Sequence, residues 1–115
     1  MKGEHSDDER INEMHAELCK MLSHPTRLKI LRQLKEEKKT VKEIVEAVET
    51  SQPTASQHLG ELKKRGLVRA EREGTTMLYS ITYPKILDAC EIIREVLFER
   101  LYEEQKLLDR GDDDE

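Results

Sequence analysis

The segment from residue 52 to residue 65 combines uncharged polar side chains with three consecutive cations. Glutamine amides can form two hydrogen bonds with adenine, and serine or threonine hydroxyls can bond bases or phosphates. Basic side chains neutralise phosphates and make binding depend on salt. This chemistry suits the grooves and the backbone of duplex DNA. The candidate DNA contacts of the segment are Gln52, Thr54, Ser56, Gln57, His58, Lys63, Lys64 and Arg65.

A second group of candidate contacts lies around Gly74, where Arg69, Arg72 and Thr75 flank a short turn signal. A glycine between two short strand-like runs indicates a hairpin. Arginines beside such a tip suit a minor groove or its phosphates. His58 has a second interpretation, because it falls near an apolar stripe and can make a structural hydrogen bond instead of reading a base. Polar residues on a helix are most often solvated surface, so the prediction depends on the whole arrangement.

The distribution of charge agrees with a DNA contact in the middle of the chain. The chain has 20 Lys and Arg against 25 Asp and Glu, a net charge of −5. Residues 25–82 nevertheless carry twelve Lys and Arg against eight Glu, whereas the remainder carries eight against seventeen acidic residues. Binding responds to the local field more than to the total. The middle segment is therefore expected to attract nucleic acid while the ends repel it.

Local start and stop signals predict the elements that position these residues. Ser6–Glu9 and Thr40–Glu43 have the spacing of capping boxes, which open helices. The three prolines, at 25, 53 and 84, all fall at predicted helix starts. Gly66 stands where a left-handed residue ends a helix. The predicted helices span about 6–22, 25–35, 40–48, 52–65 and 82–107, and the predicted strands span 67–72 and 76–81 around a turn at 73–75.

This order predicts a mainly α fold with a small β-hairpin, a winged helix-turn-helix in which the helix at 40–48 supports the helix at 52–65. Aromatic residues make up 3% of the chain and Trp is absent, so the core is expected to consist of Leu, Ile, Val, Met and Ala. We expect a flexible N-terminus at 1–8, one DNA-binding and dimerisation domain at 9–108, and a disordered acidic tail at 109–115.

The last helix carries an apolar stripe that has two interpretations. Ile86, Cys90, Ile93, Leu97 and Leu101 are spaced so that they share one face. The stripe can cover the helix's own domain, but it is long for so small a core. A two-fold partner would bury the excess apolar surface. We therefore expect a homodimer.

Other protein classes lack their motifs in this sequence. It has no H-E-x-x-H, no P-loop and no nucleophile elbow, so neither an enzyme nor a cofactor is expected. The first residues lack the apolar region of a signal peptide, and no apolar run approaches the ~18 residues of a membrane span. Cys19 and Cys90 have neither a CxxC nor a zinc-site spacing. Free thiols in a cytoplasmic protein are the simplest expectation.

Three stretches together resemble the arsenic-repressor (ArsR) family: His24 to Leu31 (HPTRLKIL), Ser51 to Leu59 (SQPTASQHL) and Leu62 to Val68 (LKKRGLV). The resemblance covers about residues 12–100. It implies a homodimeric winged-helix regulator whose first and last helices pair across the two-fold axis. It also implies that the helix from Gln52 reads DNA. Members of this family typically repress transcription until an inducer, often a metal ion, releases them.

The resemblance is weaker at the inducer site. Metal-sensing members often carry Cys-x-Cys in the helix that matches 41–48, and this chain has none there. Others place Asp-x-His and a later His-x-x-Glu on the last helix, where this chain has Asp88-x-Cys90 and Leu101-x-x-Glu104. No metal site is therefore predicted. Redox sensing by Cys19 and Cys90 is an alternative, and so is a simple packing role for Cys90. A winged-helix module that binds protein instead of DNA is the rival to the regulator hypothesis.

Overall fold

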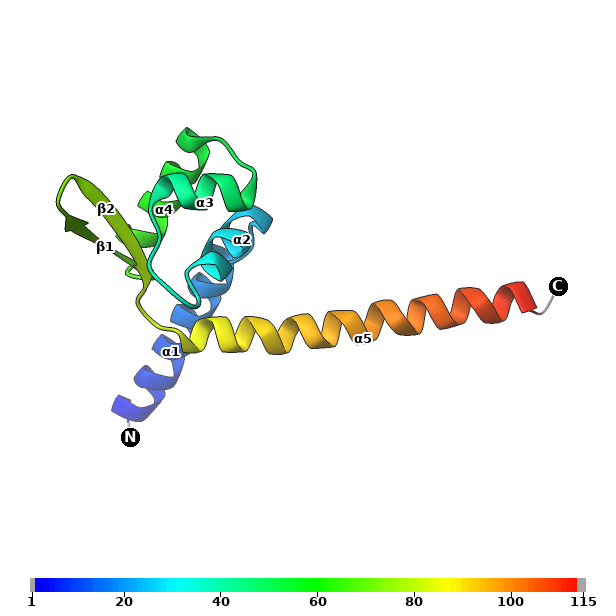
Figure 1. Ribbon diagram of the computed structural model, residues 1–115. Helices are drawn as coiled ribbons and strands as arrows, with labels where there is room; N and C mark the ends of the chain where they lie inside the picture. Colours follow the sequence, from blue (N-terminus) through cyan, green and yellow to red (C-terminus); the bar gives the residue numbers. More distant parts are fainter. Residues whose placement is uncertain (1, 114–115) are drawn as a thin grey trace. The chain divides into compact units, whose positions relative to one another are not determined.

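The order of secondary structure matches the predicted order in the computed structural model, which describes the backbone of residues 2–113 and the side chains of residues 7–111. The chain divides into two compact units, one up to Thr82 and one from Tyr83 onward. Figure 1 shows the elements. The first unit contains α1 (Lys2–Met21), α2 (Pro25–Gln33), α3 (Val41–Val48), α4 (Gln52–Lys64), β1 (Val68–Glu73) and β2 (Thr76–Ile81), and the second contains α5 (Lys85–Asp113).

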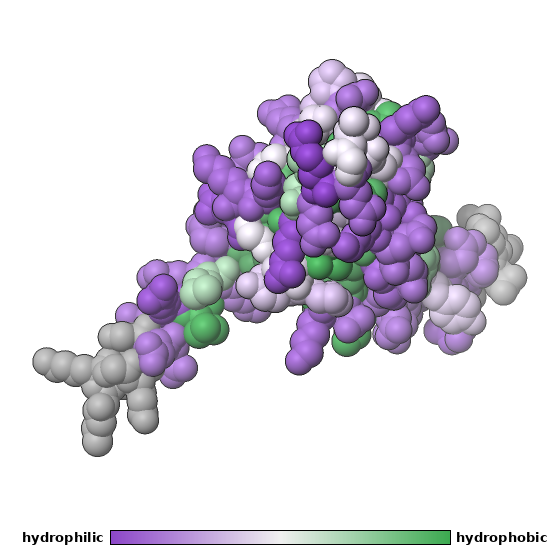
Figure 2. All heavy atoms as spheres, turned by 60° about the vertical axis from the view of Figure 1, so that its left-hand side comes forward, coloured by the Kyte–Doolittle hydropathy of each residue, from purple (hydrophilic) through white to green (hydrophobic). Residues whose placement is uncertain are grey.

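The core of the first unit lies where α2 packs on α3, α3 on α4 and α4 on β1. Each of these elements contributes aliphatic side chains to it, as expected for a chain with few aromatic residues. A fully buried Leu or Ile contributes about 1.5–3 kcal/mol relative to an exposed one. Polar side chains cover most of the face shown in Figure 2, with apolar side chains visible between them. The buried residues of this core are Ile30, Leu31, Leu34, Ile44, Val48, Ala55, Leu59, Leu62, Leu67 and Val68.

Local hydrogen bonds form two of the predicted helix starts in the first unit, those of α3 and α4. The Thr40 hydroxyl accepts a bond from the Glu43 amide at 3.2 Å, and the Glu43 carboxylate accepts one from the Thr40 amide at 3.0 Å. This capping box begins α3, and these bonds hold the pKa of Glu43 below its usual range. The Ser51 hydroxyl accepts from the Thr54 amide at 3.2 Å and begins α4. Gly66 has a φ of 79°, the left-handed conformation predicted for it.

Some element bounds differ from the prediction. Helix α1 begins at Lys2, before the predicted capping box, and α5 continues to Asp113. The later part of α5 contains an Arg100–Glu104 ion pair at i,i+4, which supports helix beyond the apolar stripe. Residues 1, 114 and 115 of the predicted flexible ends lie outside the described residues. The flexibility of the ends stays a prediction.

The hairpin turn is shorter than the predicted turn at 73–75. Glu73 pairs with Thr76, so the loop contains Gly74 and Thr75 alone. Gly74 has a φ of 63° while Thr75 has no positive φ, the pattern of a type II′ turn. Such a turn matches the right-handed twist of the strands. Glycine is required at its first position, and this explains why the turn forms there.

The hairpin is attached to the loop before α3 by backbone and side-chain bonds. Lys39 and Tyr79 exchange two backbone hydrogen bonds, of 3.0 and 2.8 Å. The Lys38 ammonium lies 2.8 Å from the Glu71 carboxylate. That contact lowers the pKa of Glu71 and raises the pKa of Lys38. The wing is thus held near the middle of its strands while its tip is exposed.

Candidate nucleic-acid interface

Helix α4 has one buried side and one exposed polar side. Ala55, Leu59 and Leu62 are fully buried against the core. Because each residue advances about 100° around a helix, Gln57 and Lys64 lie near the middle of the opposite side. Both are exposed. The helix therefore presents a polar surface that no part of its own unit covers.

The other candidate residues of α4 fall on the two flanks of this surface. Gln52, Ser56 and Lys63 share one flank and are exposed, and Arg65, just after the helix, is exposed on the other. Thr54 and His58 are half-buried on that second flank. The Ser51 hydroxyl lies 2.8 Å from the Thr54 hydroxyl, so Thr54 already contributes to the cap. The structure thus brings Gln52, Ser56, Gln57, Lys63 and Lys64 onto adjoining parts of one surface.

Gly60 also lies on this surface, although it is not among the predicted DNA contacts. It lies one turn from Ser56 and from Lys64, on the exposed side of α4, and a Cβ built on it would meet nothing within 4 Å. Its φ is not positive, so the fold itself does not require glycine there. A glycine inside a helix costs about 1 kcal/mol relative to alanine. Because Gly60 has no side chain, a ligand can approach the helix backbone closely at this position.

The two wing arginines lie on opposite faces of the hairpin. Side chains alternate along a strand, so Arg69 shares a face with Glu71 and Arg72 shares a face with buried Val68. Both arginines are exposed, and so is Thr75 in the turn. A DNA strand that lies against one face of the hairpin can therefore contact Arg69 or Arg72 but not both. Thr75, in the turn, can be reached from either face.

His58 makes the structural hydrogen bond that the sequence analysis gave as its alternative role. Its Nδ1 accepts a bond from Arg27 Nε at 3.0 Å. Its ring centroid lies 5.9 Å from that of His24. Burial, then the charge of Arg27, then His24 hold the pKa of His58 below its usual value. A neutral imidazole with Nδ1 as acceptor follows from this geometry.

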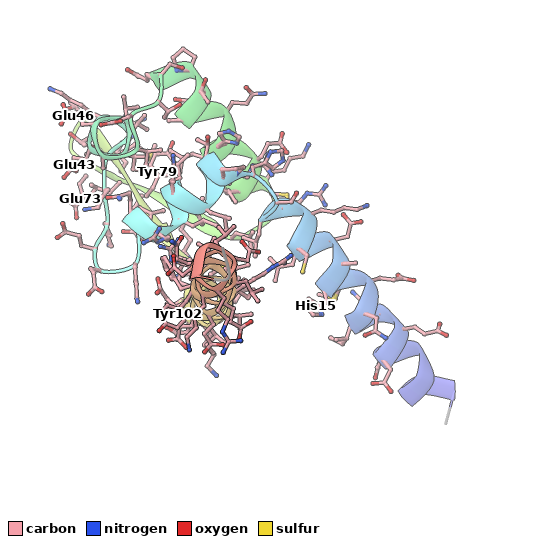
Figure 3. The ribbon with its side chains drawn as sticks, turned by 90° about the vertical axis from the view of Figure 1, so that its right-hand side faces the viewer. His15, Glu43, Glu46, Glu73, Tyr79 and Tyr102 are labelled. Atoms are coloured by element: carbon pink, nitrogen blue, oxygen red, sulfur yellow. The ribbon has the colours of Figure 1, made fainter. Side chains whose placement is uncertain are left out.

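The cysteines and histidines form no metal-binding cluster in the part of the chain that is described. Cys19 is exposed on α1, Cys90 is half-buried on α5, and neither is in a disulfide. Among the described side chains, no three His, Cys, Asp or Glu residues are grouped to hold a metal ion. His15 is exposed on α1 (Figure 3), and the side chain of His5 lies outside the described residues.

Helix α5 forms the second unit. Ile86 and Cys90 of its predicted stripe are half-buried. Ile93, Leu97 and Leu101 are 57%, 49% and 59% exposed. In Figure 3 this helix is seen almost end-on, with side chains such as Tyr102 radiating around it. The single chain therefore leaves a long apolar surface on α5 uncovered.

A short supporting helix, a second helix with an exposed polar side and a hairpin wing define a winged helix-turn-helix DNA-binding protein. Residues 24–70 match the family described as "Bacterial regulatory protein, arsR family". An uncharacterised HTH-type transcriptional regulator of Mycobacterium tuberculosis is 37% identical over 92 residues, which cover 79% of this chain and 81% of that protein. The chain belongs to the ArsR family of DNA-binding transcriptional regulators, a family that is not enzymatic.

Solved structures agree with this assignment. The crystal structure of the same M. tuberculosis protein gives a TM-score of 0.71 at 36% identity, covering 81% of this chain and 94% of that one. A homodimeric winged helix-turn-helix DNA-binding domain from Mycobacterium bovis gives 0.71 at 32% identity, covering 82% and 87%. The repressor BigR of Xylella fastidiosa gives 0.71 at 33% identity, covering 77% and 91%. In the described part of the chain, no helix combines the length and apolar character needed to span a bilayer.

Proposed function

We propose that this chain is a transcriptional repressor that binds an inverted-repeat operator as a homodimer. The observation that carries the proposal is helix α4, whose apolar side is fully buried while Gln52, Ser56 and Gln57 remain exposed. Such a helix can enter a major groove without unfolding any part of the protein. Two relatives are named as repressors, BigR of Xylella fastidiosa and PagR of Bacillus anthracis, and they support repression over activation.

The homodimer rests on the uncovered apolar side chains of α1 and α5. Ile11 and Met14 on α1 and Ile93, Leu97 and Leu101 on α5 are all about half exposed or more. Soluble proteins rarely leave large apolar patches in water. The M. bovis relative is a homodimeric domain. A two-fold dimer would place two α4 helices about one turn of DNA apart.

Salt dependence tests the DNA-binding half of the proposal. We expect the protein to bind an inverted-repeat duplex from its own upstream region, with affinity that falls as salt rises. Replacing Lys63 and Lys64 by Ala should weaken binding to all sequences alike. The slope of log affinity against log salt should decrease by up to about 4 for a dimer, about 0.9 per lost phosphate contact. Fluorescence anisotropy across a salt series measures both quantities.

A matched control for this experiment changes two exposed lysines of α5, Lys85 and Lys106, to Ala. The control loses the same charge, so a slope that decreases equally in both variants would reflect the total charge of the protein. Absent or salt-insensitive binding on every duplex would favour a protein-binding role instead.

Gly60 gives a second prediction, in which stability and affinity change in opposite directions. Gly60→Ala should raise the free energy of unfolding by about 1 kcal/mol, because alanine is the better helix former. The added methyl would project into the proposed interface. It should weaken operator binding about tenfold, as expected if one base contact of 1–3 kcal/mol is displaced. Thermal unfolding and anisotropy measure the two effects.

Gly111→Ala is the control for Gly60→Ala, because Gly111 is also helical with nothing within 4 Å of a built Cβ. It should leave operator binding unchanged. If Gly60→Ala stabilises the protein and binds DNA as tightly as the wild type, the surface around Gly60 does not approach DNA closely.

The inducer is a separate hypothesis with its own test. We propose that an inducer releases the operator, either an oxidant that acts on Cys19 or Cys90 or a metal ion. Cys19 is exposed and Cys90 lies on the proposed dimer helix, so both thiols are candidates. Release is compared in Cys19→Ser and Cys90→Ser proteins under an oxidant, polysulfide and a series of metal ions. Unchanged release in both variants would remove the thiols from the mechanism.

A further inference from the structure

One guanidinium group joins three helices of the first unit. Arg27, in the first turns of α2, donates from Nε to His58 Nδ1 on α4 at 3.0 Å. Its Nη1 donates to the backbone carbonyl of Met21, the last residue of α1, at 3.3 Å. The same nitrogen lies 3.5 Å from the Met21 sulfur. Arg27 therefore contacts the end of the proposed dimer helix α1 and the proposed reading helix α4 at once.

The Arg27–His58 bond joins α4 to a helix other than those it packs on most closely. Helix α4 packs closely on α3 and β1, and α2 packs closely on α3. The Arg27–His58 bond is a direct connection from α2 to α4 across 31 positions of sequence. A dimer must hold its two reading helices at a separation that fits the DNA repeat. A small rotation of α4 relative to α1 would change that separation in both subunits.

The chemistry of His58 suits a fixed link better than a base contact. Nδ1 can accept a bond from Arg27 only while that nitrogen carries no proton. Burial and the neighbouring charge of Arg27, with His24 nearby, hold the pKa of His58 below its usual value and so keep the ring neutral. The ring is half-buried. A hydrogen bond from a cation to a neutral, half-buried acceptor is charge-assisted and therefore strong.

We propose that Arg27 is a positioning residue, which sets the angle of α4 relative to α1 through His58 Nδ1 and the Met21 carbonyl. The proposal rests on the proposed function, because a position matters only if α4 reads DNA in a dimer. In this proposal Arg27 and His58 determine which half-site spacing the dimer prefers, and neither contacts a base.

A double-mutant cycle on operator binding tests the link. Arg27→Ala and His58→Ala should each weaken binding about tenfold, and the double variant should be no weaker than the worse single one, since both remove the same bond. Additive losses would overturn the proposal and return His58 to base reading. His58→Asn should keep most of the affinity, because its amide oxygen can accept where Nδ1 does. Lys29→Ala, an exposed cation on the same helix, controls for charge.

The preference for one half-site spacing is the second measurement. It should change if Arg27 positions α4, and it should not change if Arg27 only stabilises the fold. Duplexes with the two half-sites moved one base pair closer or further apart should bind the wild type much more weakly than the best spacing. Arg27→Ala should discriminate less among them while remaining a dimer by sedimentation. Unchanged discrimination would overturn the proposal. Wild-type protein that binds no inverted repeat at all would instead overturn the proposed function.

Nuclear magnetic resonance of the His58 ring tests the contact without DNA. In Arg27→Ala the pKa of His58 should rise towards its usual value, because a neighbouring cation has been removed. Lys29→Ala should leave it unchanged. An unaltered pKa in Arg27→Ala would show that the bond is not formed in solution. If Arg27→Ala does not fold, Arg27→Lys replaces it in the DNA-binding experiments, because lysine keeps the charge but lacks the two directed donors. In the resonance experiment Arg27→Gln replaces it, because glutamine removes the charge.

Discussion

Replacing Leu97 by Glu is expected to convert the protein into a monomer and to weaken operator binding by about 100-fold or more, the gain that linking two binding modules provides. Leu97 is 49% exposed in the middle of the apolar surface of α5. In a dimer its side chain would be buried against its twin, and burying an unpaired carboxylate there is strongly unfavourable. Sedimentation velocity measures the oligomeric state, and anisotropy measures the affinity.

Glu99→Lys is the control for Leu97→Glu, because residue 99 lies roughly 200° around the helix from residue 97. It reverses one charge, a change of two units against one unit in Leu97→Glu, on an exposed position of α5. We expect it to remain a dimer with nearly wild-type affinity. A monomeric wild type, or a dimeric Leu97→Glu protein with unchanged binding, would show that α5 does not form the two-fold contact.

The dimer prediction also explains an apparent imbalance in the chain. From α2 to β1 the first unit buries most of its large aliphatic residues, whereas α5 leaves Ile92, Val96, Phe98 and Leu101 more than half exposed. Arg94 lies 5.4 Å from the Phe98 ring, and Lys106 lies 5.7 Å from the Tyr102 ring. Such cation–π pairs cover part of an aromatic ring, but they leave the aliphatic stripe open. A second copy of the chain is the partner that the proposed inverted-repeat operator would require.

The elements of the fold could be predicted because their signals are local. A capping box needs only Thr40 and Glu43, and a helix start needs only a proline in the first turn. The burial of Ala55, Leu59 and Leu62 follows from their spacing in one helix. These properties depend on a few neighbouring residues, so they can be read without knowing the tertiary structure.

The candidate site was less predictable, because its details depend on contacts between distant residues. The bond between Arg27 and His58 joins residues 31 positions apart, and no periodicity in the sequence indicates it. By contrast, Arg69 and Arg72 are three positions apart in one strand, so their placement on opposite faces could have been predicted from their spacing. The predicted turn was one residue too long, because Glu73 fits a strand as well as a turn.

Removing the side chains of Ser56 and Gln57 is expected to abolish most of the sequence preference while leaving non-specific binding intact. Both are exposed, Gln57 in the middle of the polar side of α4 and Ser56 beside it. A bidentate base contact supplies about 1–3 kcal/mol of discrimination. A dimer uses each residue twice, so the Ser56→Ala/Gln57→Ala protein should lose roughly 100-fold or more in the ratio of specific to non-specific affinity. Competition between operator and scrambled duplexes at one salt concentration measures this ratio.

The contrast with the lysine variant makes this experiment decisive for the orientation of α4. Phosphate contacts position a protein, whereas base contacts specify a sequence. The Lys63→Ala/Lys64→Ala protein should therefore lose affinity for both duplexes and keep their ratio, whereas the Ser56→Ala/Gln57→Ala protein should lose the ratio and keep its salt slope. A double change of Ser56 and Gln57 that preserves the ratio would place another surface against the bases. The wing, with Arg69, Arg72 and Thr75 exposed on it, would then be the surface to change next.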